Sequence, residues 1–222
     1  MSINHPYKGP AELPAAFPVF PLSGALLLPR GDMPLNIFEP RYMTMIDDAL
    51  RTHRLLAMIQ PDPAPDNSPV KPRLCKVGCL GRITQFAETG NGRYFICLTG
   101  VARFKLVEEL EAMTPYRQCR GDFTPFASDF TPRSGEEAVD RAGVLAALKL
   151  FAKAIKQDID WKSINDAPNE ALVNALSIMS PFGPKEKQAL LEAADLKTRA
   201  DVLIAITEME LARGGDTPTQ LQ

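Results

Sequence analysis

The sequence has few of the residues that most often carry out catalysis or bind metals. It contains two histidines, four cysteines and one tryptophan in 222 residues. Neither His5 nor His53 stands in a metal-ligand spacing or beside a nucleophile motif. No glycine is followed by lysine, so the phosphate-binding sequence G-x-x-x-x-G-K-[ST] is missing. We therefore expect a protein that is not an enzyme and has no cofactor, with a hydrolase of unfamiliar type as the alternative, since Asp, Glu, Ser and Thr are plentiful.

The sequence also lacks a strong net charge and a long apolar run. The 25 Lys and Arg residues against 27 Asp and Glu give a net charge of -2, which argues against a general binder of polyanions. No segment approaches the roughly 18 apolar residues of a membrane span, and the N-terminal MSINHPYKGPAELPAAF has no signal-peptide core. We therefore predict a cytoplasmic protein without a membrane partner, for which nucleic acid is a disfavoured partner.

The four cysteines are expected to be reduced thiols, because no secretion signal accompanies them. Cys75 and Cys79 stand four apart in RLCKVGCLGRI, which reads as a strand, where four residues span about 13 Å. A straight strand keeps them too far apart to bind one metal ion. A bulge at Gly78 would bring them closer, with Cys97 and Cys119 completing a four-thiolate zinc site, so zinc stays an alternative. We favour small buried side chains and no metal.

The first half of the chain reads as short strands. FPVF, GALLLP and MPLNIF are apolar runs bounded by Pro or Gly, and they predict edge strands of a small sheet or barrel. CLGRITQFAETGNGRYFICLT places the turn residues 90–92 between two strand-like runs, which predicts a hairpin. Beyond Gly100, apolar residues alternate with Arg103 and Lys105, so we predict one packed face and one solvent-exposed face there.

The stretch PLNIFEPRY, residues 34–42, predicts a junction between a strand and a helix. Pro40 suits the first helical turn, and PRYMTMIDDALR has the apolar spacing of one buried helix face. A Glu39 carboxylate is favoured at a helix N-terminus. Arg41 is expected to find its partner elsewhere, because residues i and i+2 do not face each other on a helix. We interpret these residues as a structural motif, made of Asn36, Phe38, Glu39, Pro40, Arg41 and Tyr42.

After Thr131 the pattern becomes helical. Ser134 and Glu137 have the spacing of a capping box ahead of AVDRAGVLAALKLFAKAIKQ, which predicts a long helix. Further helices are predicted to start at Asp166, Pro184 and Asp195. The fold class is therefore α+β, with a β-rich subdomain over residues 17–123 that contains one helix, followed by a helical bundle over residues 134–213.

The stretches FPLSGALLLPRGDMPLNIFEPRYMTMIDDAL and MSPFGPKEKQALLEAADLKTRADVLI resemble the N-terminal domain of the ATP-dependent Lon proteases. The resemblance runs from about Phe17 to Leu211, and NxFEPRY is its most specific part. It implies that the β-rich part is a PUA-like pseudo-barrel and that the protein recognises protein substrates. We expect a stand-alone form of this substrate-binding domain, without the ATPase and protease domains of Lon.

The resemblance implies a protein-binding module that engages exposed or unfolded segments of client proteins, with the junction between barrel and bundle as the expected surface. RNA binding through the PUA-like sheet and docking onto full-length Lon protease are the alternatives. Three phenylalanines, Phe123, Phe126 and Phe130, lie in the linker segment DFTPFASDF. They either pack the linker onto the two subdomains, which we favour, or bind an apolar segment of a protein partner.

Overall fold

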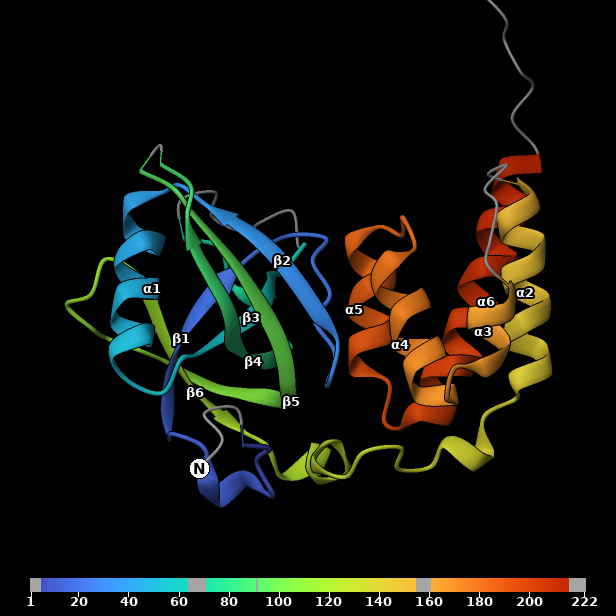
Figure 1. The fold of residues 1–222 in the computed structure, drawn as a ribbon, viewed down its shortest axis with the longest axis horizontal. Coiled ribbons are helices and arrows are strands. Elements are labelled where there is room, and N and C mark those ends of the chain that lie inside the picture. The colour runs from blue at the N-terminus through green and yellow to red at the C-terminus, as the bar shows by residue number, and fades with distance from the viewer. Residues whose placement is uncertain (1–4, 64–70, 91, 155–160, 216–222) are drawn as a thin grey trace, which may run out of the picture.

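The structure is a computed structural model that describes residues 5–63, 71–90, 92–154 and 161–215. The strands are β1 (Ala16–Pro21), β2 (Asp32–Ile37), β3 (Leu55–Pro61), β4 (Leu74–Glu88), β5 (Tyr94–Leu110) and β6 (Arg117–Asp122). The α-helices are α1 (Pro40–Arg51), α2 (Arg141–Ala154), α3 (Trp161–Asp166), α4 (Asn169–Met179), α5 (Pro184–Glu192) and α6 (Leu196–Gly215). Three short 3-10 helices are η1 (Pro10–Glu12), η2 (Thr124–Phe130) and η3 (Glu136–Ala138). Figure 1 shows the strands with α1 on one side and the other helices on the opposite side.

The strands close into a barrel because β5 is long enough to pair with several neighbours. The sheet order is β2-β5-β4-β3-β1-β6, with a further pairing between β5 and β6. Residues 94–99 of β5 pair with β2, and residues 105–110 pair with β6. The ring is therefore β1-β3-β4-β5-β6, and β2 extends it beside the first half of β5. Pairing is antiparallel except between β1 and β3.

Two apolar cores lie on opposite faces of these strands. In β3, Leu55, Ala57 and Ile59 point to one core, whereas Leu56 and Met58 point to the other. All five strands of the ring contribute to the first, which we call the barrel core. The second, which we call the outer core, includes residues of α1 and continues into the helical bundle. A strand buried on both faces reads as a continuous apolar run, which explains the sequence LLAMI.

The apolar run GALLLP is a loop, so the strand predicted for it is wrong. Residues 22–31 join β1 to β2, and their only pairing of strand type is an isolated bridge between Pro29 and Gly100. Gly24 and Arg30 both have positive φ, at 73° and 63°, and these turns interrupt a regular ladder on either side of the run. The run is apolar because the side chains of residues 26–28 are fully buried in the outer core.

The helix predicted from PLNIFEPRY is confirmed, with Pro40 as its first residue. Four residues of the predicted apolar face are buried, namely Tyr42, Met45, Ile46 and Ala49, while its fifth residue, Leu50, is half-buried. The Tyr42 ring packs against Phe20 with 4.2 Å between centroids. Pro40 fits because the first helical residue has no intrahelical partner for its N–H.

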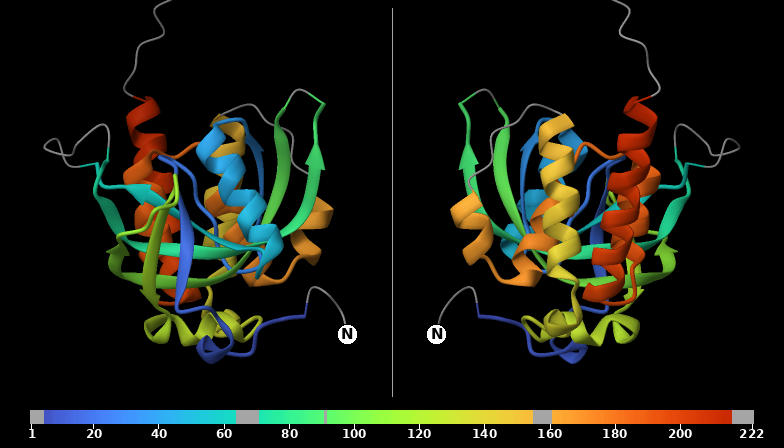
Figure 2. Two further views of the ribbon diagram at one scale, coloured as in Figure 1. Left: turned by 90° about the vertical axis from the view of Figure 1, so that its left-hand side faces the viewer. Right: turned by 90° about the vertical axis from the view of Figure 1, so that its right-hand side faces the viewer.

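In the bundle, α4 and α5 lie between the barrel and the neighbouring helices α2 and α6 (Figures 1 and 2). The predicted helix starts at Pro184 and Asp195 are confirmed, since Pro184 opens α5 and Asp195 Oδ1 accepts the Thr198 N–H at 2.7 Å. The start predicted at Asp166 is wrong, because that residue ends α3 and α4 follows Pro168. Among the described residues, no helix has the length and apolar character that crossing a membrane requires.

The capping box predicted at Ser134 and Glu137 is wrong. Gly135 has φ 73° and Val139 is extended, so the chain makes only the short turn η3 between them. The helix α2 begins later, where Asp140 Oδ1 accepts the Gly143 N–H at 3.0 Å. A correct capping signal therefore lay six residues after the predicted one. The division of the chain into subdomains at residues 17–123 and 134–213 stays a prediction.

Candidate functional site

An open groove lies at the surface between the barrel and the bundle, and we call it the junction groove. Its volume is about 380 Å³, and it lies between the loop that leads into β2 and the helix α4. Arg133 of the linker also contributes to its wall. The groove lies at the surface where the sequence predicts client binding. Its lining residues are Pro29, Arg30, Gly31, Asp32, Arg133, Pro168, Glu170, Ala171, Asn174, Ala175, Ile178 and Met179.

The loop wall of the groove is held by close approach of two backbones. Arg30 N donates to the Gly100 carbonyl at 2.8 Å, and Gly100 N donates to the Gly31 carbonyl at 2.8 Å. A Cβ at position 100 would lie 2.0 Å from the Leu28 carbonyl oxygen, so any side chain there would push the loop away. Gly31 is less constrained, since a Cβ there would meet the end of the Ile178 side chain of α4 at 2.7 Å, which can move aside.

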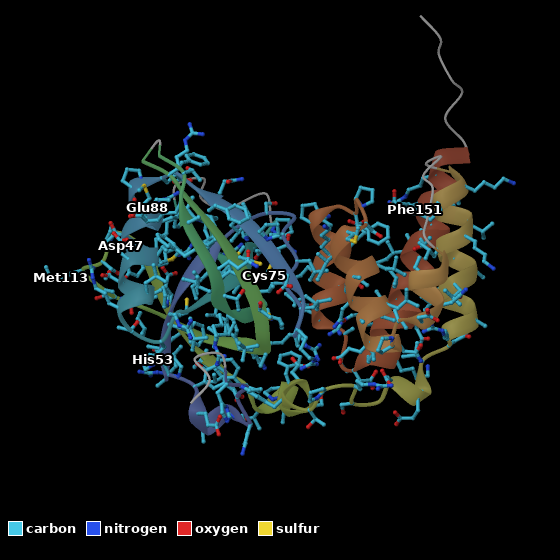
Figure 3. All side chains as sticks on the ribbon, viewed as in Figure 1. Asp47, His53, Cys75, Glu88, Met113 and Phe151 are labelled. Carbon is cyan, nitrogen blue, oxygen red and sulfur yellow. The ribbon has the colours of Figure 1, made fainter. Side chains whose placement is uncertain are left out.

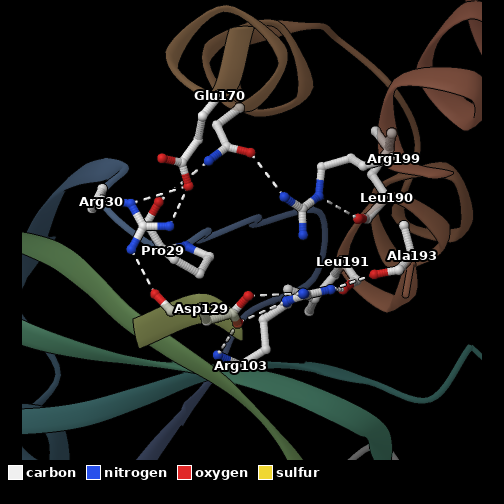
Figure 4. Close-up of polar contacts among 10 residues, drawn as sticks. Pro29, Arg30, Arg103, Asp129, Glu170, Leu190, Leu191, Ala193 and Arg199 are labelled. Atoms are coloured by element: carbon white, nitrogen blue, oxygen red, sulfur yellow. Dashed lines mark hydrogen bonds and ion pairs between the residues drawn. The ribbon is translucent and has the colours of Figure 1, made fainter. Parts of the chain in front are cut away.

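Glu170 joins three parts of the chain at the edge of the groove (Figure 4). Its Oε1 accepts the Arg30 Nε hydrogen at 3.1 Å and pairs with Arg30 Nη2. Its Oε2 accepts the backbone N–H of Arg133 at 2.8 Å. Arg30 Nη1 donates to the Asp129 carbonyl oxygen at 2.6 Å. The loop, the linker and α4 are thus fixed to one another by charge-assisted hydrogen bonds.

Below the groove, the buried Arg103 of β5 ties the barrel to the linker by an ion pair and to the bundle by hydrogen bonds. Arg103 is only 1% exposed, so the prediction of a solvent-exposed face on β5 is wrong at this residue, whereas Lys105 is exposed as predicted. Its backbone N and its Nε donate to Asp129 Oδ2, both at 2.9 Å, and its Nη2 donates to Oδ1 at 2.8 Å. Its Nη1 donates to the carbonyl oxygens of Leu191, at 3.2 Å, and Ala193. The linker η2 and the α5–α6 turn cover this face, so Arg103 is buried with a hydrogen-bond partner for each of its side-chain nitrogens.

The bundle wall of the groove is an apolar stripe on α4, formed by Ala171, Ala175 and Met179. The three residues are exposed and follow one another at the i, i+4, i+8 spacing of a single helix face. Met179 is 77% exposed. The other side of α4 is committed to the core, where Leu172 and Val173 are buried. The stripe therefore offers apolar surface that no described part of the chain covers.

The motif predicted at residues 36–42 lies at the other end of β2, away from the junction groove. Asn36 and Phe38 are exposed, and Phe38 is exposed by 61%. Arg41 does not find a partner elsewhere as predicted, because its Nε donates to Glu39 Oε2 at 2.9 Å. Glu39 precedes the helix in extended conformation, so the expectation that residues i and i+2 of a helix point apart does not apply to Glu39 and Arg41. The Glu39 side chain makes no hydrogen bond to the helix N-terminus. The structural interpretation of this motif stays a prediction.

The three linker phenylalanines lie in different surroundings. Phe123 is buried in the barrel core, with its ring 5.8 Å from Phe17 and 5.9 Å from Phe104 between centroids. Phe126 is buried beneath the Arg103 guanidinium, whose central carbon lies 4.4 Å from the ring centroid. Phe130 is half-buried beside a second cavity. These positions favour the packing interpretation, and a role in binding protein stays a prediction.

The cysteines of the zinc alternative are dispersed. Cys79 belongs to the outer core and Cys119 to the barrel core. Burial raises the pKa of the Cys75 and Cys119 thiols to about 11 each, which disfavours the thiolate that a metal ion needs. Within the part of the chain that the structure describes, no group of three or more His, Cys, Asp or Glu residues could hold a metal ion.

Sequence reasoning identified the junction as a surface but missed the charged residues that build it. The predicted solvent exposure of Arg103 is wrong, and no sequence pattern points to Arg30 or Glu170. One signal in the sequence points to Asp129: it lies between Phe126 and Phe130 in the linker segment DFTPFASDF, where a carboxylate that becomes buried needs a cationic partner. The identity of that partner depends on the tertiary fold.

Comparison of the sequence with known proteins finds Lon proteases as relatives. Lon protease 2 of Myxococcus xanthus is 24% identical over 204 residues, which cover 88% of this chain and 24% of that protein. Lon protease 2 of Sorangium cellulosum is 27% identical over 201 residues, which cover 87% of this chain and 24% of that protein. The chain thus spans about a quarter of the length of these curated relatives.

Solved structures share the fold. A Lon N-terminal domain protein from Xanthomonas campestris superposes with a TM-score of 0.62 at 19% identity, over 86% of this chain and 97% of that one. The N-terminal domain of a Mycobacterium avium complex Lon protease gives 0.63 at 19% identity, over 87% and 98%. The predicted α+β fold, a pseudo-barrel followed by a helical bundle, is confirmed. A family model described as the ATP-dependent protease La (LON) substrate-binding domain matches residues 16–208, and the chain therefore belongs to that family.

Proposed function

We propose that this chain is a non-enzymatic protein-binding module that holds exposed or unfolded polypeptide segments in the junction groove. The observation that carries the proposal is the apolar stripe of α4, Ala171, Ala175 and Met179, which lines an open groove of about 380 Å³. Family membership supports it, since the family is described as a substrate-binding domain and the relatives are named as proteases. The missing phosphate-binding sequence supports the absence of a motor activity in this chain.

The size and chemistry of the groove suit a polypeptide segment. A volume of about 380 Å³ falls within the ~300–1,000 Å³ range of ligand pockets, so the groove has room for a few side chains rather than for a folded domain. Met179 is unbranched and polarizable, and such a side chain adapts to apolar partners of different shape. Arg30, Arg133 and Glu170 also line the groove and carry charges of both signs, which suits clients with varied polar side chains.

The test uses a reduced and carboxymethylated, hence permanently unfolded, fluorescent model protein as the client. Fluorescence anisotropy measures its affinity for the full chain and for Met179→Asp, which places a charge in the apolar stripe. Because a few apolar contacts dominate such interfaces, we expect affinity to fall about 5- to 30-fold, equivalent to roughly 1–2 kcal/mol. Melting temperature should stay unchanged, since Met179 is 77% exposed.

Met113→Asp is the matched control. Met113 is fully exposed, and it follows β5 on the side of the barrel opposite to the bundle (Figure 3). The control changes the same residue type to the same charge, so we expect it to leave affinity unchanged. An equal loss in both variants would mean that general surface apolarity, and not the junction groove, binds the client. Unchanged affinity in Met179→Asp would contradict the proposal directly.

A further inference from the structure

One buried cation in the bundle lacks a full set of partners. Arg199 of α6 is 4% exposed, and its Nε donates to the Leu190 carbonyl oxygen at 3.0 Å. Its Nη1 donates to Asn174 Oδ1 at 2.9 Å. Its Nη2 is buried and has no hydrogen-bond partner among the described residues. Leaving a buried charged donor without an acceptor is costly, so this nitrogen calls for an acceptor that the described part of the chain does not supply.

Arg199 lines a small cavity, which we call the arginine pocket. Figure 4 shows the Arg199 guanidinium above the Arg103–Asp129 pair, with its unbonded nitrogen directed into the space between them. The cavity measures about 80 Å³ and lies next to the junction groove, with which it shares the walls Pro29, Arg30 and Glu170. Its remaining lining residues are Arg103, Ser128, Asp129, Thr131, Ser134, Gly135, Asp195, Leu196 and Arg199.

The charges around the arginine pocket leave Arg199 without its own counter-ion. Arg103 is paired with Asp129, and Arg30 is paired with Glu170. The third carboxylate, Asp195, is exposed and accepts the Thr198 N–H at the start of α6. Burial lowers the pKa of Arg199 to about 10, so the guanidinium is still charged at neutral pH.

Polar side chains and the start of a helix line the pocket. Ser128, Thr131 and Ser134 are exposed and belong to this lining, so three hydroxyl-bearing side chains border the pocket at its solvent-exposed mouth. Leu196, the first residue of the 20-residue helix α6, also lines the pocket. The N-terminus of a helix carries a partial positive charge, part of which the capping carboxylate of Asp195 offsets here.

We propose that the arginine pocket binds a small oxyanion, either a phosphate or a carboxylate group, with Arg199 Nη2 as its principal donor. A cavity of about 80 Å³ restricts the ligand to one such group and excludes a nucleotide or a folded partner. The bound oxyanion supplies both the missing acceptor and the missing negative charge. This site goes beyond the proposed function, because its ligand is an ion and not a polypeptide segment.

Isothermal titration of the full chain at pH 7 with inorganic phosphate, and separately with acetate, tests the proposal. Both titrations are run at constant ionic strength set with sodium chloride. We expect saturable binding of at least one anion with a one-to-one stoichiometry, and preference between the two identifies the group that the pocket takes. Heat that fails to saturate for both anions up to 20 mM would overturn the proposal.

Variants locate the binding. Ser134→Glu puts a carboxylate at the exposed mouth and is expected to weaken binding at least tenfold without affecting folding. Ala127→Glu makes the same charge change at an exposed position of η2 that does not line the pocket, so its affinity should match the parent. Arg199→Lys keeps the charge but removes the Nη2 donor, and it should also weaken binding at least tenfold.

The outcomes are separable even where one variant folds poorly. If Arg199→Lys does not give folded protein, the comparison of Ser134→Glu with Ala127→Glu decides. Saturable binding that all folded variants retain would place the anion elsewhere and refute the arginine pocket. Loss of anion binding in Ser134→Glu with unchanged affinity for the unfolded client would support this site independently of the junction groove.

Discussion

Replacing Asp129 by alanine is expected to destabilise the whole protein, because it leaves the Arg103 charge buried and unpaired. Arg103 and Asp129 are 1% and 6% exposed, and Asp129 accepts three hydrogen bonds from Arg103. Removal of one partner of a buried pair costs about 3–5 kcal/mol. The bonds from Arg103 Nη1 to the Leu191 and Ala193 carbonyls stay and do not compensate the charge. For a protein of this length the melting temperature should fall by about 6–20 °C.

Equilibrium unfolding in urea, followed by circular dichroism, measures this loss for Asp129→Ala, for Arg103→Met and for the double variant. The double variant should lose less than the sum of the single losses, because it no longer contains a buried unpaired charge. Glu108→Ala is the control, since Glu108 pairs with Arg120 and both side chains are about half exposed. Its expected loss is below about 1 kcal/mol. If Asp129→Ala loses no more than this control, the buried pair does not hold the junction together.

Three further predictions concern single side chains. Glu39→Ala and Arg41→Ala should each lower the free energy of unfolding by less than about 1 kcal/mol because their ion pair is half exposed, and urea unfolding showing a loss above 2 kcal/mol would contradict this. Phe126→Ala should cost about 3–5 kcal/mol of stability by the same method with unchanged client affinity, whereas lost affinity at unchanged stability would establish a binding role. The hydrogen bond from Arg117 lowers the pKa of Glu109, so the stabilisation by this carboxylate is complete above the unfolded pKa and is lost as pH falls through the lower folded pKa. The stability difference between the parent and Glu109→Gln should therefore shrink between pH 6 and pH 3, and a constant difference would refute the assignment.

Local signals in the sequence predicted the elements that depend on local physics. Pro40 and Pro184 open helices because a proline fits the first turn, and Asp195 caps the next helix with its own carboxylate. The predicted hairpin rests on turn residues between two strand-like runs, and β4 and β5 do pair as its arms, while residue 91 of the turn lies outside the described residues. Each of these features is decided within a few residues of the chain.

Alternation in a strand predicts which residues share a face, but not what covers that face. Arg103 lies on the face of β5 opposite Phe104, as alternation requires, yet it is buried because residues 124–130 and the α5–α6 turn lie over it. These covering segments follow more than 20 residues later in the chain. The loop over residues 22–31 failed as a strand for a similar reason, since its apolar side chains serve the outer core and its backbone meets Gly100. Both errors concern long-range packing.

The candidate site likewise depends on long-range packing that local sequence patterns do not predict. The helix sequence NEALVNALSIM is apolar on most sides, so periodicity alone could not tell the buried side from the stripe of Ala171, Ala175 and Met179. The structure separates them because the barrel loop approaches one side of α4 and α6 packs against another. Which exposed residues of a helix line a groove is a property of its neighbours.

The junction is fixed by directional contacts, and this bears on how the two proposed sites relate. An ion pair adds little net stability, whether it is exposed or buried, but its charge-assisted hydrogen bonds are directional. Here Glu170 holds the loop, the linker and α4 in one arrangement, and Arg30 and Glu170 border both the junction groove and the arginine pocket. If an anion in the pocket shifts these two side chains, client affinity must change by the same factor by which the client changes anion affinity. Because the two sites share walls, coupling needs no movement of the barrel against the bundle, only a change in the Arg30–Glu170 pair.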